Sequence, residues 1–267
     1  CGGLVVLTLV IIIAYLLMGS LPVLSLDFLT EAPKGANTRG GILTPLVGTI
    51  YLMIIVFAFA IPIGVLSAVY LAEYQGKGRG ARFWSIVVSN LAGVPSIVYG
   101  LLGLALFVTF AGLGRSLIAA GLTLAILALP IVISASREAI QAIPPSLREA
   151  SLALGATKWQ TVRHHVLPYA LPGILTGVIL ALSRAAGETA PILLTGAAFY
   201  MSSMPDSILS QFMALPYHVY AVATQTMAGM NGSPVVYGAA IVLLLLVIGM
   251  NLIAIMVRKR YREKYRW

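Results

Sequence analysis

Long stretches of this 267-residue chain contain no Asp, Glu, Lys or Arg, and they restrict the fold more than any other feature. Four of these stretches are 40–72, 83–114, 116–136 and 207–257. A membrane-spanning helix needs about 20 mainly apolar residues. Only 9% of the residues are charged, whereas soluble domains carry roughly 25%. The sequence therefore argues against a soluble globular enzyme and favours a membrane-embedded chain.

The apolar regions predict an all-α, polytopic membrane bundle of about six spans. We place the spans near residues 4–24, 44–72, 84–111, 116–136, 166–200 and 234–257. Pro95, Pro172 and Pro191 are expected to kink or break the longer regions. Residues 207–233 lack charge but carry polar side chains, so we expect an external or re-entrant segment, with a turn at Asn231-Gly232-Ser233.

The basic residues indicate how the chain is oriented. Thirteen of the 17 Lys and Arg residues fall in segments 73–82, 137–165 and 258–267. Because Lys and Arg gather in short cytoplasmic loops, we place these segments in the cytoplasm. Two crossings separate each basic segment from the next, so both chain ends are predicted to be cytoplasmic. The basic tail is also expected to meet anionic lipid.

The segment 137–165 is too long and too regularly patterned to be only a connection between spans. Ser146 followed by Glu149 forms a capping-box pattern and Gly155 is a suitable stop, so we expect a helix of about two turns between them. Its small apolar face would consist of Leu147, Ala150, Ser151 and Leu154. A helix this short is marginal alone in water, so we expect it to dock against another surface.

A second helix is expected directly after the first. Thr157 and Gln160 repeat the capping pattern, and Trp159, Val162 and Val166 would share one side of the helix that follows. Periodicity alone favours an interfacial helix pair that packs on its own membrane bundle. The identity of the residues is needed to distinguish that structural role from docking to another protein.

Several residues of this loop resemble the EAA loop of ATP-binding-cassette importer permeases in type and spacing. The matching residues are Glu149-Ala150-Ser151, Gly155 and Leu167-Pro168. Ser151 replaces the usual second alanine and His165 the usual isoleucine, without changing the spacing. In that family the loop is a coupling helix that inserts into a groove on an ATPase subunit. The resemblance therefore implies ATPase-coupling roles for Glu149, Ala150, Ser151, Leu154 and Gly155.

Two further stretches are similar to phosphate-importer permeases of the PstA type. They are GVPSIVYG at residues 93–100 and SRAAGETAP at residues 183–191. The resemblance implies a type I, MetI-like permease in a prokaryotic inner membrane, which imports inorganic phosphate. Residues 1–39 would then form a first span with an external loop. Residues 40–267 would form the permease core, with its coupling loop at 137–165.

The resemblance also implies the partners of the chain. No Gly-Lys-Ser or Gly-Lys-Thr occurs, so we expect no catalytic residue and no cofactor in this chain. ATP and Mg would be bound by two partner ATPase subunits. A second permease would complete the pore, and an external phosphate-binding protein would deliver the substrate. Membrane lipid is a further expected contact, whereas the sparse charge argues against a nucleic-acid partner.

Arg184 and Glu188 are the most informative charged residues within an apolar region. Such groups are costly in a membrane unless they are paired or face water, and their i, i+4 spacing lets them meet on one helical face. One interpretation is a neutralised internal pair that only fixes helix packing. The other places Arg184 on the substrate path, where its guanidinium could bind phosphate through two parallel hydrogen bonds while Glu188 keeps that binding weak.

Other patterns have structural interpretations. Gly173 and Gly177 form a small-xxx-small pattern suited to close helix packing. His164 and His165 lack neighbouring ligands with metal-site spacing, so we expect no metal site. Two alternative functions stay open: a permease for another oxyanion such as sulfate or molybdate, and a passive channel or membrane anchor. Competition between anions would test the first, and co-purification with a nucleotide-binding subunit would argue against the second.

Overall fold

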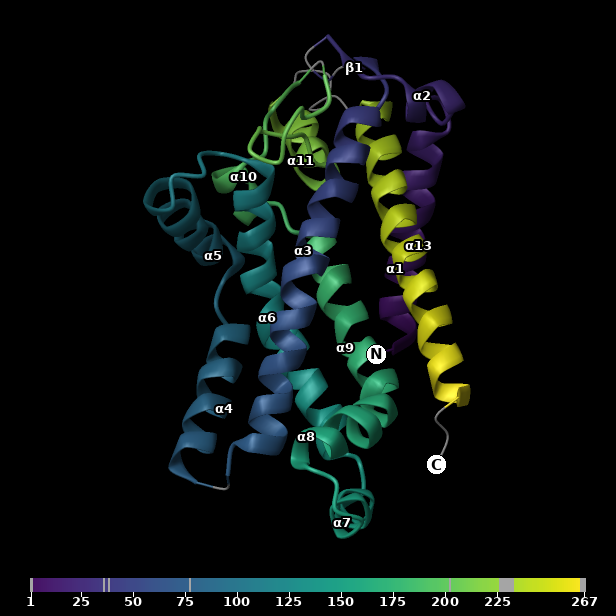
Figure 1. The fold of residues 1–267 in the computed structure, drawn as a ribbon. Helices are drawn as coiled ribbons and strands as arrows, with labels where there is room; N and C mark the ends of the chain where they lie inside the picture. The colour runs from purple at the N-terminus through teal and green to yellow at the C-terminus, as the bar shows by residue number, and fades with distance from the viewer. Residues whose placement is uncertain are drawn as a thin grey trace. The chain divides into compact units, whose positions relative to one another are not determined.

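The computed structural model of the chain is mostly helical, as expected for a chain whose backbone polar groups must bond one another within lipid. It describes residues 2–35, 37, 39–76, 78–201, 203–225 and 233–264. The α-helices (Figure 1) are α1 (Gly2–Ser20), α2 (Leu26–Thr30), α3 (Leu43–Val69), α4 (Arg79–Ala92), α5 (Ser96–Gly103), α6 (Leu117–Gln141), α7 (Pro145–Ala153), α8 (Lys158–Thr161), α9 (Leu167–Gly187), α10 (Ala190–Thr195), α11 (Leu215–Gln225) and α13 (Pro234–Lys264). The π-helical segments are η1 (Tyr70–Tyr74), η2 (Leu104–Phe110) and η3 (Val162–Val166). Strands β1 (Pro33–Lys34) and β2 (Arg39–Gly40) pair antiparallel.

The membrane spans follow the predicted pattern. Five helical segments within the described residues are long and apolar enough to cross a membrane: Gly2–Ser20, Leu43–Tyr74, Leu117–Gln141, Lys158–Gly187 and Pro234–Glu263. The predicted span at 84–111 is a helix pair, Arg82–Ala92 and Ser96–Phe110, bent by 100°. Pro95 lies in the break, where it cannot donate a backbone hydrogen bond. The described part of the chain therefore holds up to six spans when the bent pair counts as one.

The predicted span at 166–200 was wrong at both of its ends. Lys158–Gly187 is the apolar span, because α8 and η3 run directly into α9. After α9 ends at Gly187, the short helix α10 starts at Ala190. In the segment predicted to be external or re-entrant, α11 has 11 residues, which is too short to cross a membrane. Asn231 and Gly232 of the predicted turn lie outside the described residues.

The chain divides into two compact units, each made of three separate stretches. The first comprises Cys1–Ile54, Gly100–Thr123 and Ala186–Ile248. Its apolar core contains Phe28, Ile42, Leu215, Val235, Ala239 and Val242. Thr49 Oγ1 in α3 accepts a 2.8 Å hydrogen bond from the Leu215 amide, which satisfies one of the free N–H groups at the start of α11. The rings of Tyr15 and Tyr237 pack edge to face at 5.6 Å and tie α1 to α13.

The second unit comprises Ile55–Tyr99, Leu124–Ala185 and Gly249–Trp267. Helices α6 and α9 approach closely within it, because a Cβ added at Gly173 would lie 2.6 Å from Ala139 Cβ and one added at Gly177 would clash with Ala135. The prediction that these glycines serve helix packing is confirmed. Ser183 Oγ also donates a 2.6 Å hydrogen bond to Asn251 Oδ1, which joins α9 to α13.

Candidate functional site

The predicted coupling helix is present as α7, but it begins differently from the prediction. Pro144 is its N-cap residue and Pro145 its first helical residue, and no side chain caps its N-terminus. The predicted capping box of Ser146 and Glu149 was therefore wrong. Proline fits this position because its ring presets the helical φ angle and its missing N–H is not needed in the first turn.

The predicted end of α7 at Gly155 is confirmed. Gly155 adopts a φ of +84°, a left-handed conformation that glycine reaches without a Cβ penalty. Its N–H donates to the Leu152 carbonyl at 2.9 Å, and the Ala156 N–H donates to the Ser151 carbonyl at 3.2 Å. Together these two bonds form a Schellman motif. The motif terminates the helix sharply and turns the chain back towards α8.

Arg148 anchors α7 to two membrane helices of the second unit. Its Nε and Nη2 donate to Glu73 Oε1 at 2.9 and 2.7 Å, and Glu73 belongs to η1 at the end of α3. The same guanidinium donates to the carbonyl of Ile140, near the end of α6, at 2.8 Å and to that of Ile143 at 2.6 Å. The side chain of Arg148 is 21% exposed and that of Glu73 is 9% exposed. Charge-assisted hydrogen bonds between side chains that are so little exposed to solvent form a rigid connection.

Two further contacts attach the loop to the same unit. Ser151 is 6% exposed, and its hydroxyl shares a 3.0 Å hydrogen bond with that of Thr161 in α8. The Lys158 ammonium lies 5.0 Å from the ring centre of Tyr74, in cation–π contact with η1. A displacement of α7 would therefore reach the ends of α3 and α6 and the start of the α8–α9 column (Figure 1).

The second predicted helix begins with the predicted cap, but its side chains are not buried in the predicted arrangement. Thr157 and Gln160 form the predicted capping box: the Gln160 amide donates to Thr157 Oγ1, and the Thr157 amide donates to Gln160 Oε1. Val162 and Val166 are buried. Trp159 was predicted to share their side of the helix, but it is 48% exposed and does not belong to the same buried face.

Four of the five residues predicted to couple to an ATPase are exposed. The outward surface of α7 is our name for a group of exposed residues at its end: Glu149, Ala150, Leu152, Ala153, Leu154 and Gly155. Leu154 is 90% exposed, which is costly for a leucine that meets only water. Ser151 lies on the opposite side, so the predicted face of Leu147, Ala150, Ser151 and Leu154 is not a single surface. The exposed apolar groups suit contact with another protein.

Arg184 and Glu188 lie at the end of α9. Arg184 is in the last turn and is exposed, whereas Glu188 follows the helix terminus at Gly187 and is half-buried. Glu188 therefore lies one residue beyond the end of α9, and the predicted meeting of the two side chains stays a prediction. No group of three or more His, Cys, Asp or Glu that could hold a metal ion is found among the residues of known placement.

Sequence reasoning missed Glu73 as part of this site. Glu73 is the first charged residue after the stretch 40–72, and it appeared only as the start of a basic loop. Its partner Arg148 lies 75 residues later in the chain. The only signal in the sequence was a single carboxylate at the predicted end of a span. Such a carboxylate needs a hydrogen-bonding or charged partner, but the sequence does not show which residue that partner is.

Comparison with known proteins identifies the family. Residues 60–263 match the family described as "Binding-protein-dependent transport system inner membrane component". The chain belongs to this family. It is therefore a multi-pass membrane permease component of a binding-protein-dependent transporter. The PstA-type resemblance seen in the sequence is likewise borne out by the curated relatives.

Two relatives illustrate the similarity. The chain is 32% identical over 265 residues to the probable ABC transporter permease protein YqgI of Bacillus subtilis, covering 95% of this chain and 90% of the relative. It is 39% identical over 219 residues to phosphate transport system permease protein PstA 1 of Mycobacterium tuberculosis, covering 82% of this chain and 71% of the relative.

Solved structures support the fold assignment. A chain of the inward-facing MetNI methionine ABC transporter matches with a TM-score of 0.66 and 21% identity, over 82% of this chain and 97% of that chain. A chain of a bacterial alginate ABC transporter matches with a TM-score of 0.62 and 17% identity, over 81% of this chain and 78% of that chain. The predicted MetI-like helical bundle is confirmed.

Proposed function

We propose that the chain is a transmembrane permease subunit of an ATP-driven importer of inorganic phosphate. The observation that carries the proposal is the 39% identity to a relative named as a phosphate transport permease. The same name belongs to relatives from Mycobacterium leprae, at 38% identity, and Haemophilus influenzae, at 33%. Different members of the family transport different substrates. The sequence identity to phosphate permeases is therefore the reason for proposing phosphate instead of another oxyanion.

In this proposal the outward surface of α7 docks in a groove of an ATPase subunit. The subunit binds ATP and Mg, hydrolyses the ATP and moves α7, because the permease has no ATPase site of its own. Arg148 transmits the movement to α3 through Glu73 and to α6 through the backbone carbonyl of Ile140. Transport results when ATP binding favours one of two alternating conformations over the other.

The proposal places α7, the other basic loops and both chain ends in the cytoplasm. The supporting argument is the concentration of Lys and Arg in segments 73–82, 137–165 and 258–267. A second permease subunit would complete the pathway, and an external phosphate-binding protein would deliver the anion. In a bacterium with two membranes, the complex would lie in the inner one.

Arg184 is the residue that we assign to the substrate path. Its guanidinium can present two parallel N–H donors to a phosphate, and its exposure at the end of α9 leaves it accessible within this chain. Glu188 would compete for the same donors and keep binding weak enough for release. Tight binding in the pathway would slow transport, so a weak site is the useful one.

The test is uptake by the complete complex reconstituted in vesicles with its binding protein. Uptake of labelled inorganic phosphate should require ATP, and unlabelled phosphate should compete far better than sulfate or molybdate at equal concentration. Arg184→Ala should abolish most uptake, while Arg115→Ala, which removes an exposed loop charge, should not. ATP-independent uptake, or equal competition by sulfate, would contradict the proposal.

A further inference from the structure

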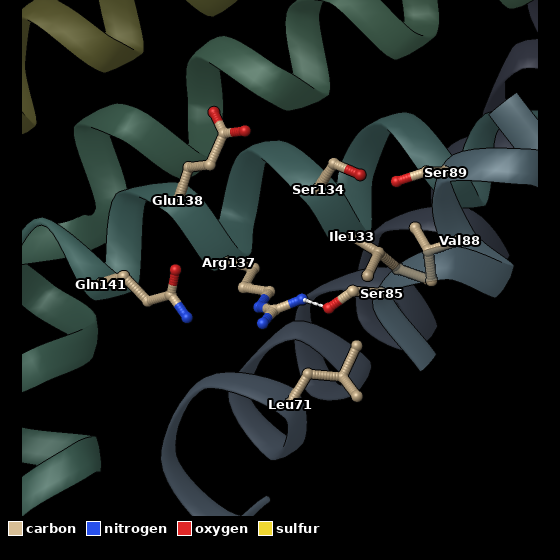
Figure 2. Close-up of a pocket in the computed structure, with 9 residues that line it drawn as sticks. All are labelled: Leu71, Ser85, Val88, Ser89, Ile133, Ser134, Arg137, Glu138 and Gln141. Atoms are coloured by element: carbon tan, nitrogen blue, oxygen red, sulfur yellow. Dashed lines mark hydrogen bonds between the residues drawn. The ribbon is translucent and has the colours of Figure 1, made fainter. Parts of the chain in front are cut away.

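A polar cavity of about 190 Å³ lies in the second unit, away from the outward surface of α7. It opens between α4, α6 and the end of the α3–η1 column (Figure 2). The lining residues are Leu71, Ser85, Val88, Ser89, Ile133, Ser134, Arg137, Glu138 and Gln141. Ser89 and Gln141 are exposed, so the cavity is accessible from the surface of this chain. Its volume exceeds that of several water molecules at about 30 Å³ each.

Arg137 supplies the charge in this cavity. Its Nη1 donates to Ser85 Oγ, which fixes the direction of the guanidinium. The guanidinium lines the cavity, and no carboxylate among the residues that the structure describes forms an ion pair with it. A partly buried charge without a counter-ion is costly. An anion bound in the cavity would neutralise it.

The other polar groups match an oxyanion rather than a cation. Ser85, Ser89 and Ser134 contribute hydroxyl groups, and Gln141 contributes an amide that can donate two hydrogen bonds. Glu138 also lines the cavity, but Figure 2 shows its carboxylate directed away from the guanidinium of Arg137. The positive charge therefore faces the cavity together with neutral donors.

The neighbouring surface places this cavity near lipid. Helix α4 begins with Arg79 and exposes Phe83, Trp84 and Ile86, which are 59%, 48% and 52% exposed. Exposed aromatic residues close to basic ones are typical of the membrane–water boundary. A phosphate group can reach such a site either as the head of a phospholipid or as the free anion.

We propose that this cavity is a binding site for a phosphate group, held by the guanidinium of Arg137 and by the hydroxyls of Ser89 and Ser134. The guanidinium attracts the phosphate through its charge, and the two serine hydroxyls donate hydrogen bonds to the phosphate oxygens. The site is separate from Arg184 in the sequence and from the outward surface of α7. It does not depend on the transported substrate, because a lipid phosphate would satisfy the same donors.

The test measures binding to the purified complex, without any transport step. Labelled inorganic phosphate is titrated by equilibrium dialysis in detergent. In parallel, phosphatidylglycerol is titrated by native mass spectrometry, with diacylglycerol, which lacks the phosphate, as the control ligand. Arg137→Gln removes the charge and Ser89→Ala removes one exposed donor. Arg163→Gln is the matched control, since it removes an exposed charge of the same unit outside this cavity.

We expect saturable binding of at least one phosphate-bearing probe to the wild type. Arg137→Gln should weaken it about tenfold or more, as expected for loss of charge-assisted bonds. Ser89→Ala should weaken it about threefold, and Arg163→Gln should change it less than about twofold. Binding of inorganic phosphate alone identifies the free anion, and binding of phosphatidylglycerol alone identifies a lipid. No saturable binding of either probe, or binding that Arg137→Gln leaves unchanged, overturns the proposal.

Discussion

Replacing Arg148 by methionine is expected to loosen α7 from the membrane helices. The variant keeps a long apolar side chain but removes the guanidinium that holds Glu73 and the carbonyls of Ile140 and Ile143. Hydrogen bonds to a charged group make a net contribution of about 1.5–3 kcal/mol each, and removing one partner of a buried pair costs about 3–5 kcal/mol. Because Arg148 is 21% exposed, we take the lower end, about 3 kcal/mol.

Hydrogen exchange of the amides in residues 145–156 measures this loss directly. A loss of about 3 kcal/mol in the opening free energy accelerates exchange roughly 100-fold. Glu73→Gln should accelerate it less, because the two carbonyl bonds of Arg148 remain. In the double variant the two effects should fall short of additivity by about 1 kcal/mol or more, since both remove the same contact.

A matched control is the exposed ion pair between Lys34 and Glu31. Its nitrogen–oxygen distance of 2.8 Å is close to that of the Arg148 pair, but its side chains are 64% and 47% exposed. Exposed pairs contribute about 0–1 kcal/mol, so Lys34→Met should change local exchange less than about fivefold. If Arg148→Met changes exchange in 145–156 no more than Lys34→Met changes its own segment, the anchoring role of Arg148 is refuted.

Three further predictions concern other parts of the chain. Gly155→Ala places a side chain at a φ of +84° and should lower the helix-end stability by about 1–2 kcal/mol, so that vesicles show less uptake per ATP hydrolysed; an unchanged ratio would argue against a coupling role for this turn. Gly177→Ala adds a methyl group against Ala135 and should lower the thermal unfolding temperature in detergent, whereas Gly187→Ala, with no atom within 4 Å of the added Cβ, should not; equal shifts would refute close packing at Gly177. Burial lowers the pKa of His218 to about 4 from the usual 6.5, so the unfolded chain binds the proton more readily between these values. Stability should then be full above about pH 6.5 and fall by at most about 3 kcal/mol towards pH 4, a slope that His218→Leu should remove in thermal unfolding measured against pH.

The spans could be predicted from the sequence because membrane insertion depends on local composition. A stretch such as 116–136 needs no distant partner to be recognised, and it matches α6 closely. The end of α7 was also readable, because Gly155 determines it through its own backbone conformation. Its start was not, since the proline at position 145 replaced the side-chain cap that Ser146 would have supplied.

Contacts between distant residues could not be predicted in the same way. Periodicity placed Ser151 on the docking face, but a hydrogen bond to Thr161 turns it inward. The partner of Arg148 is separated from it by 75 residues, and no pattern within one helix identifies it. The cavity at Arg137 likewise combines α4 and α6. In each case the important contact joins residues of different helices.

Site-specific crosslinking shows whether the outward surface of α7 contacts an ATPase subunit. Leu154→Cys, at a position 90% exposed, is compared with Ser151→Cys, at a position 6% exposed, after Cys1 has been exchanged for serine. In the assembled transporter we expect the thiol at position 154 to link to the ATPase subunit far more efficiently than the thiol at position 151. No link from position 154 in a complex that still assembles and transports would show that α7 does not dock on the ATPase subunit.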